Sequence, residues 1–128
     1  VLHLTAADAV THGAVSYESG NGHDNLGFWT NPADWADWEF EVATAGTYEV
    51  EIQQGCGEGS GGAEVNVEIG GQTLTFTVQD TGHFQQMIQR TIGQVELTTG
   101  KHTLAIKPQT KSGVAVMDLR RVVLRPSP

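Results

Sequence analysis

Two pairs of neighbouring ring side chains are the residues of this sequence best suited to contact a ligand. Phe28 and Trp29 are adjacent within the segment NLGFWTNP, and His83 and Phe84 follow Thr-Gly within the segment TGHFQ. Aromatic rings among Gly, Asn and Pro are typical of loops, where a flat ligand can reach them. The apolar face of such a ring stacks on the CH-rich face of a pyranose, so these four residues are predicted to form a stacking surface for a sugar.

Polar side chains near these rings are predicted to hydrogen-bond the hydroxyl groups of the same ligand. Phe28 and Trp29 point in opposite directions if both lie in a strand, so one should face the core and the other should face solvent. The alternative, in which all of the rings belong to the core, stays open. The predicted polar partners are Asn25, Asn31, Asp34 and Gln85.

No motif in the sequence predicts catalysis. No serine lies in a nucleophile elbow, there is no HExxH or paired-cysteine motif, and the glutamates of the predicted strands fall on the polar side of the alternation. We therefore expect a protein that is not an enzyme. A transition-metal site at His12, His23 and Asp24 is the less favoured alternative, because no two histidines have ligand spacing. A structural calcium ion is also considered, with Asp8 and Asp118 as candidate ligands.

Arg120 and Arg121 are notable because basic residues are rare in this chain. They are adjacent within an apolar segment, so they should face opposite surfaces of a sheet. A buried arginine requires a partner, and Asp118 or Glu39 is predicted to form an ion pair with it. The functional alternative is that one of these arginines recognises a sulfate or a uronate.

Composition narrows the partners that this protein can have. The 128 residues contain 15 Asp and Glu against 7 Lys and Arg, which gives a formal net charge of -8. This charge repels nucleic acids and anionic membrane surfaces, whereas neutral sugars stay open as ligands. No apolar run is long enough for a transmembrane helix, and the single cysteine, Cys56, excludes an internal disulfide. We expect a monomeric module cut from a longer polypeptide.

The periodicity of the chain predicts strands and almost no helix. Apolar and polar residues alternate in segments such as WEFEV and TYEVEIQQ, which is the pattern of a strand with one face on the core. Gly70-Gly71 lies between two such segments and predicts a two-residue hairpin turn. Loops are expected over residues 18–25, 53–62, 79–83 and 107–113. Strands are expected over residues 1–5, 14–17, 38–42, 47–54, 63–69, 73–78, 84–92, 95–97, 102–107 and 114–124.

About ten short strands separated by turns predict an all-β fold. We expect a two-sheet antiparallel β-sandwich of the jelly-roll type over residues 1–125, with residues 126–128 as a linker remnant. Such a sandwich offers the loops at its two ends and a concave sheet face as binding surfaces.

Eight segments, in the same order along the chain, resemble carbohydrate-binding modules of families 6 and 35, which belong to the galactose-binding-domain-like jelly rolls. These segments are LTAADA, NLGFW, DWADWEFEV, AGTYEVEI, GGQTLTFTV, TGHFQQM, TGKHTLAI and VMDLRRVVL. More narrowly, GCGEGSGGAEV, TGHFQ and KSGVAVMDLR are similar to a module appended to bacterial sulfatases and glycan-degrading enzymes.

The resemblance implies a non-catalytic module that targets a parent polysaccharide-active enzyme or sulfatase to a glycan. Its polypeptide would be bacterial and would be secreted, periplasmic or attached to the cell surface. The alternative is a structural or interaction domain that packs against its parent enzyme and binds no sugar.

The resemblance also implies particular site residues. In the family's loop-end site two aromatic residues enclose a sugar, and an Asn of the last strand hydrogen-bonds it. By position the aromatic residues are Phe28 and Phe84, and the Asn position, two residues before Asp118, is Val116. The family's structural calcium ion uses acids of the first strand, where this chain has Thr-Ala-Ala at 5–7, so Asp118 is the implied calcium ligand.

Overall fold

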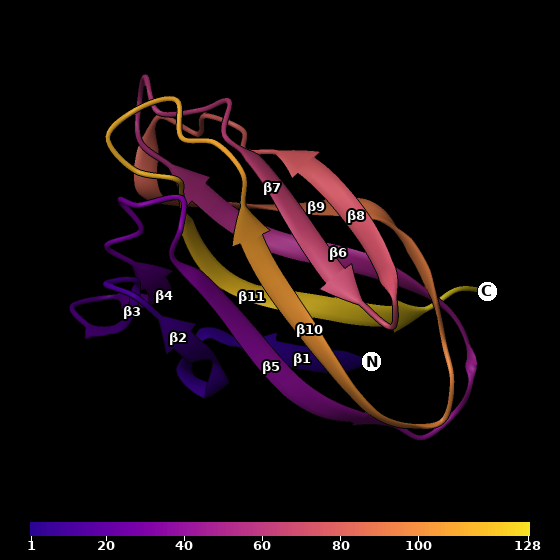
Figure 1. Cartoon of the computed structure of the whole chain (residues 1–128). Helices are drawn as coiled ribbons and strands as arrows, with labels where there is room; N and C mark the ends of the chain where they lie inside the picture. The colour runs from indigo at the N-terminus through magenta and orange to yellow at the C-terminus, as the bar shows by residue number, and fades with distance from the viewer.

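The protein is an antiparallel β-sandwich of eleven strands, described by a computed structural model that covers residues 1–128 (Figure 1). One sheet has the order β3-β4-β11-β6-β9, with β1 paired to β11, and the other has the order β2-β5-β10-β7-β8. The predicted all-β, two-sheet architecture is therefore confirmed. No helix of the protein is long and apolar enough to cross a membrane.

The first sheet has six strands and the second has five. The strands of the first sheet are β1 (Leu2–Thr5), β3 (Ser16–Gly20), β4 (His23–Gly27), β6 (Gly46–Cys56), β9 (His83–Leu97) and β11 (Asp118–Pro126). The strands of the second sheet are β2 (Val10–His12), β5 (Trp35–Val42), β7 (Glu64–Ile69), β8 (Gln72–Thr77) and β10 (Gly100–Pro108). A single 3-10 turn, η1 (Ala6–Asp8), joins β1 to β2.

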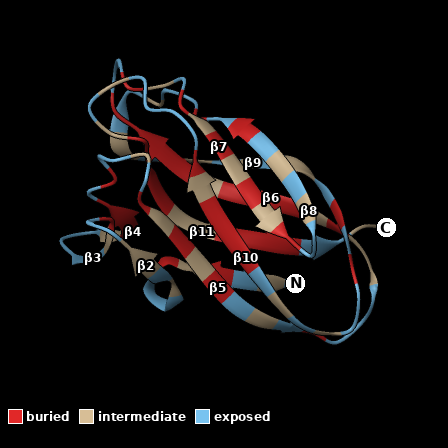
Figure 2. Cartoon of the chain, viewed as in Figure 1, coloured by how far each residue is buried: buried red, intermediate tan, exposed pale blue.

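The core lies between the two sheets and follows from the period-two alternation of the strands. In β7, for example, Val65, Val67 and Ile69 are buried, whereas the residues between them are half-buried on the outer face. Figure 2 shows the same banding of buried and exposed residues along β5 and β8. Trp38 belongs to this core, and its indole N–H donates to the carbonyl of Thr5 at 2.8 Å.

The predicted Gly70-Gly71 hairpin is confirmed, because Ile69 pairs with Gln72 across it. Both glycines have positive φ angles, 57° and 75°, as a two-residue turn matched to strand twist requires. Predicted boundaries differ elsewhere. The two strands expected over 84–92 and 95–97 are one strand, β9, and the last strand begins at Asp118 rather than Val114.

The expected loop at 18–25 is instead a hairpin of β3 and β4. Its turn is Asn21-Gly22, and both residues have positive φ angles, of 51° and 81°. Gly and Asn adopt this backbone readily. The strand expected over 14–17 covers only the first two residues of β3, and β4 was not expected. The hairpin places Glu18 directly opposite Asn25.

The two ends of the chain lie together at the end of β11 that is remote from Asp118 (Figure 1). Leu2 of β1 pairs with Leu124 of β11. Pro126, expected in a linker, is the last residue of β11 and pairs with Tyr48, and the Ser127 amide donates to the carbonyl of Thr47 at 2.9 Å.

A candidate ligand pocket at the loop end

A pocket of about 320 Å³ opens at the end of the six-stranded sheet where β11 begins, and we call it the loop-end pocket. Four of the eight predicted ligand residues line it, namely Phe28, His83, Phe84 and Gln85. Every strand that contributes to it belongs to the six-stranded sheet. The remaining lining residues are Glu18, His23, Ala115 and Asp118.

Phe28 presents its ring to solvent because Trp29 fixes the chain on its other side. The indole of Trp29 is completely buried and donates to the carbonyl of Asp34 at 3.0 Å, and the Trp29 carbonyl accepts from the Val116 amide at 2.7 Å. Phe28 is 63% exposed and has a φ of 56°, a left-handed conformation that is unusual for a bulky residue. Such backbone strain persists only where the surroundings impose it, and it is concentrated at ligand sites.

The prediction that Trp29 stacks on a ligand is therefore wrong. One ring of the Phe28–Trp29 pair faces outward and the other inward, as expected, but the inward one is Trp29. It is a core residue with its N–H already bonded, and no ligand can reach it.

Phe84, near the start of β9, lies against the glycine-rich segment. A Cβ at Gly57 would come within 2.4 Å of the Phe84 ring, so the ring can occupy this position only because residue 57 is glycine. The loop before Phe84 is held by Asp80, whose carboxylate accepts from the amides of Gly59 and Gly82 at 2.8 Å each. Phe84 is half-buried against the core and still lines the pocket.

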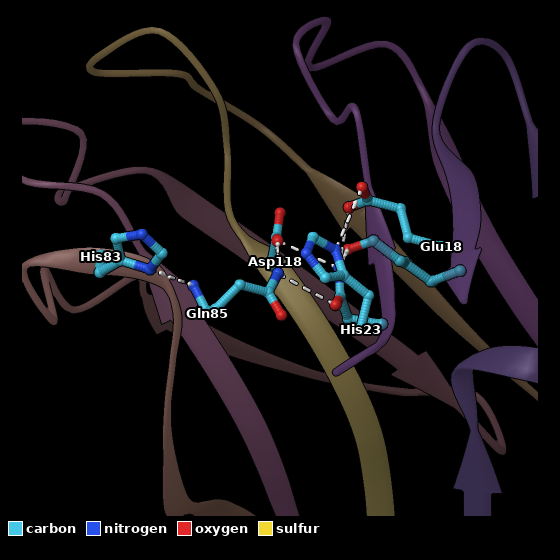
Figure 3. Close-up of polar contacts among 7 residues, drawn as sticks. Glu18, His23, His83, Gln85 and Asp118 are labelled. Atoms are coloured by element: carbon cyan, nitrogen blue, oxygen red, sulfur yellow. Dashed lines mark hydrogen bonds and ion pairs between the residues drawn. The ribbon is translucent and has the colours of Figure 1, made fainter. Parts of the chain in front are cut away.

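A buried carboxyl group, Asp118, forms the polar floor of the loop-end pocket. It is 7% exposed, and its Oδ2 accepts from the Asn25 amide at 3.0 Å and from the Gln85 amide at 2.8 Å (Figure 3). The Asn25 nitrogen also donates to Oε1 of Glu18 at 3.0 Å, so one amide joins two carboxylates. No hydrogen-bond donor of the protein contacts Asp118 Oδ1, so this oxygen is left as an acceptor for a ligand.

Burial is the main cause of an altered pKa at Asp118. Removal from water, together with the nearby charge of Glu18, raises the pKa of this carboxyl from 3.8 to about 7. The hydrogen bonds from Gln85 and Asn25 oppose both effects. At neutral pH the group therefore exists in both protonation states.

The remaining polar residues orient this floor. Asn25 was predicted to contact the ligand, but it is completely buried and positions Glu18 and Asp118 instead. His83 Nδ1 accepts from the backbone amide of Gln85 at 3.0 Å, and His23 Nδ1 lies 3.5 Å from a carboxylate oxygen of Glu18.

Besides Trp29 and Asn25, two more predicted ligand residues lie outside the pocket lining. The Asn31 side chain accepts from the Ala33 amide at 2.9 Å. Asp34 is buried, and its Oδ2 accepts from the amides of Ala14 and Val15 at 3.0 and 3.2 Å. Both side chains shape the loops beside Trp29, and Asp34 supplies the acceptor that the buried N–H group of Val15 requires.

Val116, the position of the family's sugar-binding Asn, does not line the pocket. Val116 is completely buried, and Ala115 lines the pocket in its place. Neither residue carries a side-chain amide, so the side-chain amides of this site come from Gln85 and Asn25.

Glu18 and His23 also line the pocket, although neither was among the residues predicted to contact a sugar. The Asn-Gly pair at 21–22 is the signal that could have found them. A two-residue turn there pairs Gly20 with His23 and Glu18 with Asn25, which brings all of these polar side chains to one hairpin.

The side chains around Asp118 do not fit a calcium ion. Calcium takes six to eight oxygen ligands, whereas the side chains bonded to Asp118 direct amide N–H groups at it. No three His, Cys, Asp or Glu residues are grouped to hold a metal. Asp8, the other candidate, accepts from the hydroxyl of Thr5 at 3.1 Å. A calcium ion stays a prediction with no support from these contacts.

A wider hollow of about 470 Å³ lies on the outer face of the five-stranded sheet beside Trp35. His12 stacks on the Trp35 ring with a centroid distance of 3.7 Å, and its Nε2 lies 2.7 Å from the carboxylate of Asp37. Lys107 forms an ion pair with Glu68 at 2.9 Å. These side chains satisfy one another, so the loop-end pocket, with its exposed Phe28 and free Asp118 oxygen, is the better ligand site.

The ion pair predicted for Arg120 or Arg121 is wrong. Neither guanidinium lies within ion-pair distance of a carboxylate, and the Nε of each is buried without a hydrogen-bond partner. Neither arginine lines the loop-end pocket.

The protein thus combines a two-sheet sandwich with an aromatic-lined polar pocket at one end. Residues 5–126 match the family described as carbohydrate binding module (family 6), and the chain belongs to that family. The resemblance to carbohydrate-binding modules stated from the sequence is thereby confirmed. A search of curated protein sequences found no match.

Solved structures share the fold at low sequence identity. A family 35 carbohydrate-binding module from Clostridium thermocellum has a TM-score of 0.78 and 15% identity, with 98% of each chain covered. The module CBM6cm-2 of Cellvibrio mixtus lichenase 5A, in complex with cellotriose, has a TM-score of 0.75 and 19% identity, with 99% of this chain and 98% of that chain covered.

The chain is also similar to part of larger enzymes. It matches an exo-β-1,3-galactanase from Phanerochaete chrysosporium with a TM-score of 0.75 and 17% identity over 96% of this chain. It spans 29% of the length of that enzyme.

Proposed function

We propose that the protein binds a sugar unit of a glycan in the loop-end pocket and has no catalytic role. The observation that carries this proposal is the combination of two accessible aromatic rings, Phe28 and Phe84, with polar groups that line the same pocket. The rings supply apolar faces for the CH groups of a sugar, and Gln85, His83 and Asp118 supply hydrogen-bonding atoms for its hydroxyls.

The polar floor supports binding because it is already organised without a ligand. The amides of Asn25 and Gln85 hold Asp118 in place, so little side-chain freedom is lost when a sugar binds. The volume of about 320 Å³ suits a small part of a glycan, with the rest of the chain extending into solvent.

We further propose that the module targets a parent polysaccharide-active enzyme or sulfatase to its glycan outside the cytoplasm. The similarity of this chain to one part of each of two larger enzymes supports this proposal. Besides the galactanase, the chain matches 28% of the length of a β-(1,4)-mannanase from Podospora anserina, at 18% identity and a TM-score of 0.71. Tethering a catalytic domain to its polymer raises the local substrate concentration, and such a gain requires no catalytic residue in the module.

A glycan array followed by titration calorimetry tests the sugar-binding proposal. The array covers neutral, uronic and sulfated polysaccharides, with calcium and again with EDTA. We expect saturable binding, which Phe28→Ala and Phe84→Ala each weaken at least roughly tenfold, because truncating a stacked ring removes about 1.4 kcal/mol or more.

Tyr17→Ala is the matched control for the ring variants. Tyr17 is an exposed aromatic residue of β3 that does not line the pocket, so its removal should leave binding unchanged. A folded wild-type protein that binds no glycan would favour a structural domain packed on its parent enzyme. Binding that survives both Phe variants would move the site away from the loop-end pocket.

A further inference from the structure

The loop-end pocket contains two carboxyl groups and no lysine or arginine. Glu18 comes from β3 and Asp118 from β11, and both accept hydrogen bonds from the same Asn25 nitrogen, each at 3.0 Å. The other titratable groups that line the pocket are His23 of β4 and His83 of β9. His23 lies beside Glu18, whereas His83 is turned toward the backbone amide of Gln85.

The polar floor of the pocket offers a ligand hydrogen-bond acceptors that the protein itself does not use. Oδ2 of Asp118 is saturated by two amide N–H groups, and Oδ1 accepts nothing from the protein although the residue is 7% exposed. A sugar hydroxyl can donate to this oxygen and complete the network. A carboxylate or sulfate group has no hydrogen to donate and would place lone pairs and negative charge against it.

No lysine or arginine lines the loop-end pocket to offset that repulsion. Lys107 is paired with Glu68 on the outer face of the other sheet, and Arg125 is paired with Glu51. Arg90 donates to Gln54 and to the carbonyl of Thr77. The earlier alternative, in which an arginine of the last strand recognises a sulfate or uronate, therefore has no basis in this pocket.

We propose that Asp118, assisted by Glu18, is a specificity-determining residue that makes the loop-end pocket accept uncharged sugar units and reject uronate and sulfated units. The inference rests on the proposed sugar-binding function. It adds a repulsive element to the aromatic contacts, and specificity depends on such elements as much as on favourable ones. Like charges brought together at a binding interface are strongly unfavourable, so a single misplaced anion is enough to discriminate.

Matched pairs of glycans test this inference. One pair is polygalacturonate and its fully methyl-esterified form, and a second is a sulfated galactan and the same galactan after desulfation. Because the pKa of Asp118 is about 7, binding is measured by calorimetry at about pH 8, in EDTA, where the carboxyl is ionised. We expect wild type to bind the uncharged member of at least one pair roughly tenfold or more tightly than the charged member.

Asp118→Asn should reduce this preference severalfold, because an amide keeps an oxygen for Asn25 and Gln85 and presents an N–H group to the pocket. Glu39→Gln is the matched control. It removes one negative charge from an exposed position on the other sheet and should leave the preference unchanged.

Equal or tighter binding of the charged member by wild type would overturn the inference and leave sugar binding intact. An unchanged preference in Asp118→Asn would overturn the role of Asp118 alone in the same way. A folded wild-type protein that binds neither member of either pair, nor any glycan of the array, would overturn the inference together with the proposed function.

Discussion

Replacing Asp118 with asparagine should change how the stability of the protein depends on pH. In the unfolded chain this carboxyl releases its proton near 3.8, whereas in the folded protein its pKa is about 7. Between these values the folded state binds more protons than the unfolded state, so this group's contribution to the free energy of unfolding falls as pH rises from about 4 to about 7. Above this window the loss is complete, and below it the contribution is fully present.

The size of the effect follows from the shift. Three pKa units at about 1.4 kcal/mol each set an upper value of about 4 kcal/mol, and water entry or relaxation around the charged group reduces it, so we expect about 1 to 4 kcal/mol. The amide introduced by Asp118→Asn cannot titrate, and its oxygen can still accept from Asn25 and Gln85. The stability of this variant relative to wild type should therefore increase by this amount between pH 4 and pH 8.

Urea unfolding in EDTA, followed by the fluorescence of the buried Trp29 and Trp38, measures this difference across the pH range. Groups remote from Asp118 contribute similarly to both proteins, so the difference between the two curves reports Asp118 together with its interaction with Glu18. Glu39→Gln, which removes an exposed carboxylate, should follow wild type. Parallel curves for wild type and Asp118→Asn would show that Asp118 is not the desolvated carboxyl described above.

Three further substitutions test how the loop-end pocket is built. Gly57→Ala should displace the Phe84 ring and weaken glycan binding several-fold in calorimetry, because the new Cβ would lie 2.4 Å from that ring; unchanged binding would contradict the packing described. Trp29→Ala should lower the free energy of unfolding by about 3 to 5 kcal/mol, as expected of a core residue and not of a ligand contact. Gln54→Leu should lower it by about 1 to 3 kcal/mol in urea unfolding, since the buried amide bonds both the N–H and the carbonyl of Gln79.

The strands were predictable because their signal is local. Period-two alternation and the Gly70-Gly71 turn need only neighbouring residues, and both identified the elements correctly. The hairpin at 16–27 was missed because its strands are short and polar, so turn residues dominate the segment. Ring type and loop context identified Phe28 and Phe84 together with Trp29 and His83, and the family resemblance singled out Phe28 and Phe84 as the pair that encloses a sugar.

The polar floor could not be predicted, because it depends on contacts between distant parts of the chain. Asn25 and Asp118 are separated by 93 positions and meet only because β4 pairs with β11. The roles of Phe28 and Trp29 were equally inaccessible. Alternation predicts that adjacent side chains diverge, but only the packed core decides that Trp29 is the one enclosed.

The course of β11 has a practical consequence for handling this protein. The strand begins at the pocket with Asp118 and ends at Pro126 after nine residues, a span of roughly 30 Å, and Leu2 pairs with Leu124 near that far end. A bead, a sensor surface or a fluorescent protein joined at either terminus would sit at the opposite pole from Phe28 and Phe84. The molecule can thus be immobilised through one end in a defined orientation, with every copy presenting its pocket to the solution.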